Sequence, residues 1–266
     1  MSAALRDVSP APDTDPNIAA CPTLVLLPGM DGTSRLFAPL LAALPPDVEA
    51  IPVAYPADPA LGYETLERRV RAALPTDRPF VLLGESYSGP IAVAIAAAPP
   101  PTLCGLILCC SFVRNPRPAT RLARGLLRIL PALPMPLRLL RSIMLGRFAT
   151  PALVRRLADA LSDVSLGVLR SRALQVIDVD VTDALSRIAL PVLYLQASHD
   201  RVIPARVAQE IAAVQPEAEI AILQGPHFLL QAAPEASSAA LVGFARRALS
   251  RFARSPVRSH PHRRIA

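Results

Sequence analysis

The sequence predicts an α/β protein in which a mostly parallel central sheet is flanked by helices and a helical lid is inserted before the last two strands. From Thr23 onward, short apolar runs alternate with longer amphipathic segments, a pattern typical of strands joined by crossover helices. Between the fourth and fifth predicted strands lie about seventy residues with leucines at helical spacing, many more than a crossover needs. These residues predict the lid, which would cover the strand ends.

Six short runs rich in Val, Ile and Leu are the predicted strands. They are apolar on both faces, as expected of strands in a buried parallel sheet. The predicted strands are residues 23–28, 49–55, 79–84, 103–112, 191–197 and 218–225. The amphipathic segments between them predict helices at residues 34–43, 63–74, 88–98, 204–214 and 234–252.

These elements divide the chain into a core, a lid and two tails. Residues 21–114 and 189–253 are predicted to form the core, and residues 115–188, which Pro131, Pro134 and Pro136 interrupt, the lid. Residues 1–20 mix Asp and Pro with small residues, and residues 254–266 are basic and lack a core-forming pattern. Both ends are therefore predicted to be disordered tails.

Composition predicts a cytoplasmic protein without a transmembrane segment. The 266 residues are 52% hydrophobic, but no uncharged apolar run is long enough to span a bilayer, and no secretory signal is visible at the start. Of four cysteines, Cys104, Cys109 and Cys110 lie in or beside an apolar run, which favours buried thiols over disulfides. No Cys and His residues have metal-ligand spacing, so no metal is expected.

The net charge of +7 comes with 28 basic residues, all of them arginine. Several lie in the C-terminal tail without interleaved aromatic residues, which argues against a nucleic-acid partner. Arg121, Arg124 and Arg128 recur at helical spacing in the lid. They form either a solvated helix face or a surface for an acidic partner, such as an acyl carrier protein or an anionic membrane.

The stretch LLGESYSGP, residues 82–90, is typical of a nucleophile at a sharp turn from strand to helix. Gly84 and Ser88 stand two positions on either side of Ser86 and are small enough for such a turn. An ordinary glycine-rich turn would share these features, so the choice depends on whether Ser86 has partners.

Two partners follow later strands in the order Ser, Asp, His. Asp200 comes directly after the fifth predicted strand, and His227 after the sixth. The carboxyl ends of parallel strands meet at one edge of the sheet. There His227 would take the proton of the Ser86 hydroxyl and Asp200 would orient the imidazole.

Each partner has an alternative. Asp200 would also serve as the N-cap of the helix that begins near Pro204. His199 competes with His227, although a histidine adjacent to the orienting acid cannot easily point back at it. The rival acids precede a strand rather than follow one, and they are Asp178, Asp180 and Asp183.

A tetrahedral intermediate also needs two hydrogen-bond donors. The backbone N–H groups of Tyr87, directly after the nucleophile, and of Met30, in the loop PGMDGT after the first strand, are the predicted pair.

The segments LLPGMDGTSRLF, LLGESYSGP, QASHDRVIP and GPHFLLQ, in this order, resemble the α/β-hydrolase superfamily, particularly small bacterial esterase-like members with a helical cap. The resemblance covers about residues 23–252. It implies a triad of Ser86, Asp200 and His227, oxyanion donors at Met30 and Tyr87, and no cofactor. The chain departs from the pattern at Ser88, where glycine is frequent, and at Pro28, where many esterases have histidine.

The predicted function is that of a serine hydrolase acting on a carboxylic ester or thioester, such as an acyl or carrier-protein methyl ester, through an acyl-enzyme. Two alternatives stay open. One is acyl transfer, or a C–C hydrolase or lyase reaction, with the same triad, and the other is ligand binding on a hydrolase scaffold.

Overall fold

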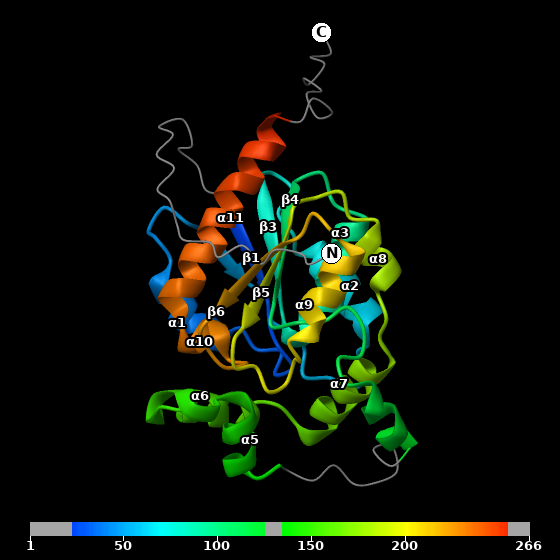
Figure 1. Ribbon diagram of the computed structural model, residues 1–266, viewed down its shortest axis with the longest axis vertical. Coiled ribbons are helices and arrows are strands. Elements are labelled where there is room, and N and C mark those ends of the chain that lie inside the picture. Colours follow the sequence, from blue (N-terminus) through cyan, green and yellow to red (C-terminus); the bar gives the residue numbers. More distant parts are fainter. Residues whose placement is uncertain (1–22, 126–134, 255–266) are drawn as a thin grey trace.

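The computed structural model describes residues 23–125 and 135–254. Its centre is a six-stranded sheet in the order β2-β1-β3-β4-β5-β6, and every neighbouring pair is parallel (Figure 1). The predicted α/β class is thus confirmed. Residues 126–134, including Arg128, Pro131 and Pro134, and both predicted tails except Arg254 lie outside the described residues.

All six predicted strands are present, and all but β3 are shorter than predicted. The strands are β1 (Thr23–Leu27), β2 (Ala50–Pro52), β3 (Phe80–Glu85), β4 (Leu103–Cys109), β5 (Val192–Ala197) and β6 (Glu219–Leu223). β2 is an edge strand and tolerates Pro52 there. The neighbouring Val53 N–H donates to the Leu26 carbonyl oxygen of β1, so the nitrogen of Pro52 faces the open edge, where no pairing donor is needed. β4 ends at Cys109 because Cys110 takes a positive φ of 46°.

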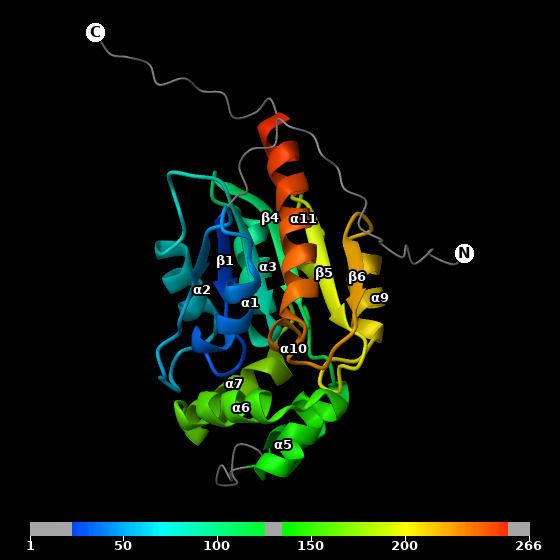
Figure 2. The ribbon, with the colours of Figure 1, turned by 90° about the vertical axis from the view of Figure 1, so that its left-hand side faces the viewer.

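Helices cover both faces of the sheet (Figure 2). On β1, Leu24 and Leu26 face one core with α1 and α11, whereas Val25 and Leu27 face the other. This alternation follows the two-residue repeat of a strand. The first layer contains α1 (Ala38–Ala43), α10 (Leu229–Ala232) and α11 (Pro234–Arg254), and the second contains α2 (Tyr63–Ala72), α3 (Gly89–Ala97), α8 (Thr182–Ser186) and α9 (Arg206–Val214).

Further helices between β4 and β5 lie beyond the carboxyl ends of the strands (Figures 1 and 2). They are η3 (Pro118–Ala123), α5 (Leu137–Met144), η4 (Gly146–Phe148), α6 (Pro151–Ser162) and α7 (Leu166–Asp178). We refer to α5, α6 and α7 as the cap. Thr150 and Ser165 accept hydrogen bonds from backbone amides at the starts of α6 and α7, which fixes where these helices begin.

The cap packs on the core through a third apolar cluster. Leu145, Leu153 and Leu157 from the cap region meet Leu36 and Phe228 from core loops. Burial of these side chains holds the cap over the sheet edge where the parallel strands end. The boundaries of a separate lid domain at residues 115 and 188 stay a prediction.

None of the helices described by the structure combines the length and apolar character needed to span a bilayer.

Candidate active site

Ser86 lies at the turn between β3 and α3 and has a positive φ of 48°. Few non-glycine residues adopt this conformation, which costs about 1–3 kcal/mol and is often found at functional sites. The turn also requires small neighbours. A Cβ added at Gly84 would lie 2.8 Å from the Ser88 carbonyl oxygen, and one added at Gly89 would lie 1.8 Å from the Ser111 Oγ.

Two neighbouring hydroxyls hold this turn. Ser111 donates a 2.6 Å hydrogen bond from Oγ to the carbonyl oxygen of Ser86. The Ser88 Oγ bonds to the carbonyl oxygen of Pro28 and lies 2.6 Å from the Tyr55 hydroxyl. Serine in place of the frequent glycine at position 88 therefore ties the turn to the end of β1, a role that its small size did not predict.

Ser86, His227 and Asp200 form one hydrogen-bonded chain. The Ser86 Oγ lies 3.0 Å from His227 Nε2, and His227 Nδ1 lies 2.8 Å from Asp200 Oδ2. The side chains of His227 and Asp200 are 4% and 3% exposed. With water excluded, the carboxylate holds the Nδ1–H tautomer, so that Nε2 is left to accept a proton from Ser86.

The second carboxylate oxygen of Asp200 fixes its own loop. Asp200 Oδ1 accepts hydrogen bonds of 2.8 Å from the amides of Val202 and Ile203. The alternative role as an N-cap is not seen, because α9 begins at Arg206 and its N-cap residue is Ala205. Asp200 is therefore held at three points, one of them His227.

The rival residues have other partners. His199 is exposed, with its Nδ1 2.7 Å from the Ser198 Oγ and its ring packed edge-on against Phe148. Asp178 pairs with Arg124 at 2.6 Å, and Asp180 accepts hydrogen bonds from Thr182.

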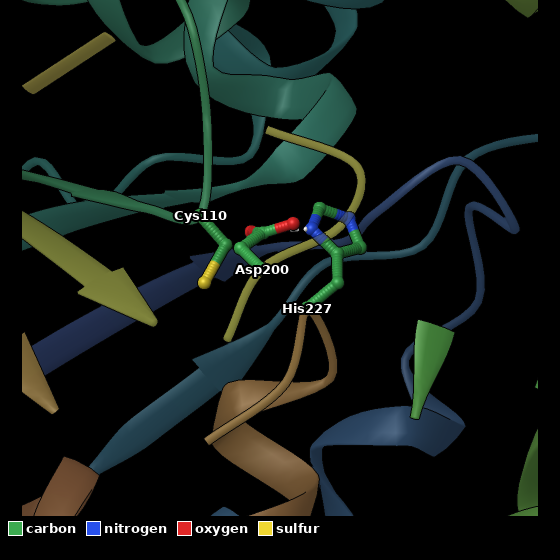
Figure 3. A group of neighbouring side chains, drawn as sticks. All are labelled: Cys110, Asp200 and His227. Carbon is green, nitrogen blue, oxygen red and sulfur yellow. Dashed lines mark hydrogen bonds and ion pairs between the residues drawn. The ribbon is translucent and has the colours of Figure 1, made fainter. Parts of the chain in front are cut away.

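Cys110 is the third potential metal ligand near His227 and Asp200. One ligand atom of each residue lies within 4.8 Å of the others, and Figure 3 shows the Asp200 carboxylate directed at the imidazole with Cys110 beside it. A hydrogen bond with Cys109 and burial raise the pKa of the Cys110 thiol, which disfavours the thiolate that metals bind. Binding a metal at Nδ1 would also break the bond to Asp200. The donor set thus fits a hydrogen-bonded chain better than a metal centre.

The loops of Met30 and Tyr87 flank Ser86. Tyr87 follows Ser86 in the short helix η2 (Ser86–Ser88), and a Cβ added at Gly29, next to Met30, would lie 3.9 Å from the Ser86 Cβ. Gly32 closes the Met30 loop at φ 73°, a conformation that favours glycine.

Arg172, which the sequence analysis did not single out, ties the cap to the Met30 loop. It projects from α7, is 2% exposed, and donates hydrogen bonds of 2.8 Å to the carbonyl oxygen of Met30 and 3.1 Å to that of Pro56. The guanidinium carbon lies 5.8 Å from the ring centroids of Tyr55 and Tyr87. The available signal was an arginine four residues after the apolar Val168, on the same face of α7.

Gln175, one helical turn further along α7, contacts the other loop. The Tyr87 hydroxyl donates a 2.5 Å hydrogen bond to Gln175 Oε1, whose amide nitrogen donates to the carbonyl oxygen of Leu61 at 3.0 Å. The Tyr87 ring stacks on Tyr63 with centroids 4.7 Å apart. α7 therefore contacts both loops beside Ser86.

Glu85, directly before Ser86, is a buried carboxyl group. Burial raises its pKa from the ordinary value of 4.5 to about 7, although a 3.0 Å hydrogen bond from Gln231 Nε2 acts in the opposite direction. Gln231 Oε1 is buried without a partner among the described residues, and a protonated Glu85 is a suitable donor for it. The structure thus favours neutral Glu85 below pH 7.

Replacing Glu85 by Gln is expected to change how stability depends on pH. Between about pH 4.5 and 7 the folded protein holds a proton that the unfolded chain releases, so wild-type stability falls as the pH rises through this window. Glutamine does not titrate. The variant should therefore exceed the wild type by up to about 3 kcal/mol in free energy of unfolding at pH 8, and the gain should vanish at pH 4.

Urea unfolding across this pH range measures the difference. Glu64→Gln, at an exposed position of α2, is the matched control and should follow the wild type. A gain of Glu85→Gln that is equal at pH 4 and pH 8 would contradict the assigned titration.

Comparisons with known proteins agree with this architecture. The sequence model of the alpha/beta hydrolase family matches residues 24–240 of the chain. Among solved structures, an enol-lactonase from Burkholderia xenovorans LB400 is similar with a TM-score of 0.71 and 19% identity, covering 86% of this chain and 92% of its own. An esterase from Exiguobacterium antarcticum has a TM-score of 0.71 at 18% identity, covering 86% and 93%. A bromoperoxidase from Bacillus anthracis has a TM-score of 0.67 at 13% identity, covering 85% of this chain and 92% of its own. No curated protein matches the chain.

Proposed function

Because this chain belongs to the alpha/beta hydrolase family, we propose that it is a serine hydrolase that cleaves a carboxylic ester or thioester through an acyl-enzyme. The observation that carries the proposal is the hydrogen-bonded chain from Ser86 through His227 to Asp200. A serine hydroxyl becomes an effective nucleophile only when a base within hydrogen-bond reach takes its proton. Here the base lies 3.0 Å away.

The first half of the reaction forms the acyl-enzyme. The Ser86 Oγ attacks the acyl carbonyl carbon while His227 Nε2 takes the hydroxyl proton, and Asp200 stabilises the imidazolium that results. The tetrahedral intermediate collapses as the bond to the leaving alcohol or thiol breaks, and His227 gives its proton to that group. In the second half, water attacks the acyl carbon with His227 as base, and Ser86 is regenerated.

The amides of Met30 and Tyr87 are proposed as donors to the oxyanion of both intermediates. Each preorganised donor of this kind contributes about 10²–10³-fold to kcat. The Met30 N–H can bind the oxyanion only if the backbone of its loop keeps the same conformation. Arg172 stabilises this conformation because it donates a hydrogen bond to the carbonyl oxygen of Met30. We assign Arg172 as a positioning residue that acts through the Met30 loop.

Replacing Arg172 by Gln is expected to lower kcat about 100-fold with little change in KM, because a displaced donor is lost mainly in the transition state. Lysine has a single donor nitrogen in place of the two guanidinium nitrogens that bond Met30 and Pro56, so it should restore only part of kcat. Ester-hydrolysis kinetics measure the split.

Arg156→Gln is the matched control, because Arg156 is an exposed arginine of α6 in the same cap. A purely structural role would be revealed by an Arg172→Gln variant that is less stable but keeps its wild-type kcat when folded. Equal loss in both variants would also refute the assignment.

A panel of p-nitrophenyl esters and thioesters of rising acyl length tests the proposed reaction. We expect release of the free acid with a burst of leaving group when deacylation is slow. Added methanol separates hydrolysis from acyl transfer, because a transferase would yield mainly the methyl ester. A folded protein that turns over no ester or thioester in the panel, yet binds an acyl ligand, would favour the binding-protein alternative.

A further inference from the structure

The cap region is one of two stretches of the sequence that are rich in arginine and free of acidic residues, the other being the C-terminal residues 236–266. Residues 114–156 contain ten arginines and neither Asp nor Glu, and the flanking acidic residues in the sequence are Glu85 and Asp159. This surplus exceeds the net charge of +7 for the whole chain. Arg114 pairs with Glu210 and Arg124 with Asp178, and the remaining surplus attracts an object with negative charge to the cap end of the molecule.

Large apolar side chains are exposed within the same region. Met135, Leu137 and Leu139 are 51%, 42% and 50% exposed, and Leu122 of η3 is 91% exposed. Large apolar side chains that are grouped on a surface usually mark an interaction site. Exposed basic and apolar side chains alternate in this segment, since Arg138 and Arg141 are also exposed.

α5 presents apolar side chains both inward and outward. Leu140 and Met144 pack on the third apolar cluster and hold the helix on the core, while Leu137 and Leu139 remain exposed. Figures 1 and 2 show α5 at the end of the molecule opposite the C-terminal end of α11, outside the edge where the parallel strands finish. The exposed side of α5 thus faces away from the protein on the side of the candidate active site.

We propose that α5 docks this protein on an anionic lipid surface through a cap face formed by Met135, Leu137, Arg138, Leu139 and Arg141. Apolar side chains enter the boundary between headgroups and acyl chains, and the arginines bind lipid phosphates. The long stem of arginine packs beside the leucines while its guanidinium remains at the headgroups. Exposed aliphatic side chains among the arginines favour lipid over an acidic protein, for which charge alone would suffice.

Vesicle binding tests this proposal without turnover, so its outcome is independent of the proposed hydrolase activity. The full-length protein is sedimented with vesicles of ether-linked phosphatidylcholine, with and without ether-linked phosphatidylglycerol. We expect binding to the anionic vesicles that weakens with salt. Arg138→Glu/Arg141→Glu should reduce the partition coefficient on the order of 100-fold, and Leu139→Ser about 10-fold.

Matched controls distinguish the cap face from general charge and hydrophobicity. Arg251→Glu/Arg254→Glu reverses two exposed arginines at the end of α11, and Ile222→Ser replaces a side chain that is also 50% exposed. Both controls should bind as the wild type does.

Three results would overturn the proposal. One is wild-type protein that stays unbound with anionic vesicles, and another is binding that the cap and control variants lose equally. The third is a dimer in solution that Leu139→Ser dissociates, which would assign the face to a second copy of the chain. Retention of the cap variants' thermal unfolding transition confirms that the comparison is between folded proteins.

Discussion

Replacement of Ser86 by Ala is expected to lower kcat for ester hydrolysis roughly 10⁶-fold, with the fold retained. The variant loses the attacking oxygen 3.0 Å from His227 Nε2. Alanine has the same Cβ as serine, so the positive φ at this position costs no more than before. His227→Ala should cost a similar factor, since a serine without its base is a poor nucleophile.

Ser186→Ala is the matched control for this loss. Ser186 is an exposed serine of α8 whose Oγ bonds to the carbonyl oxygen of Asp183. Its kcat should equal that of the wild type. Residual activity of Ser86→Ala above one-hundredth of the wild type would show that another group performs the reaction.

Asp200→Asn is expected to lower kcat about 10⁴-fold because it favours the wrong tautomer of the His227 imidazole. The amide oxygen takes the place of Oδ1, which accepts from the amides of Val202 and Ile203. The NH₂ group then faces His227 Nδ1 in place of Oδ2. Because NH₂ only donates, His227 must carry its proton on Nε2, where it can no longer accept the proton of Ser86.

Asp180→Asn provides an unusually close control. Asp180 Oδ1 accepts from the Thr182 amide two residues ahead, the same local contact that Asp200 makes with Val202. This variant should keep wild-type kcat. If Asp200→Asn did so as well, Asp200 would be a turn residue rather than the orienting acid.

The sheet and the spatial meeting of Ser86, Asp200 and His227 were predictable from sequence because both follow from local rules. Buried parallel strands leave continuous apolar runs, and each of the three residues follows one such run. Features that depend on tertiary structure were harder to predict from the sequence. The early end of β4 depends on a positive φ at Cys110 that no apolar pattern encodes.

The contacts of Arg172 were not predictable in the same way. They join residues that are 142 and 116 positions apart in sequence, and they form only after α7 docks on the core. Helical periodicity places Arg172 on a helix face but does not tell which loop that face will meet. The same holds for Gln231 beside Glu85, 146 positions away.

Labelling by a fluorophosphonate, with the modified residue mapped by mass spectrometry, tests the proposed serine mechanism most directly. The reagent bonds to an activated serine and needs no knowledge of the substrate. We expect an adduct on Ser86 in the wild type, none at this position in Ser86→Ala, and very slow labelling in His227→Ala. A folded wild-type protein that remains unlabelled, or an adduct on a different serine, would contradict the proposal.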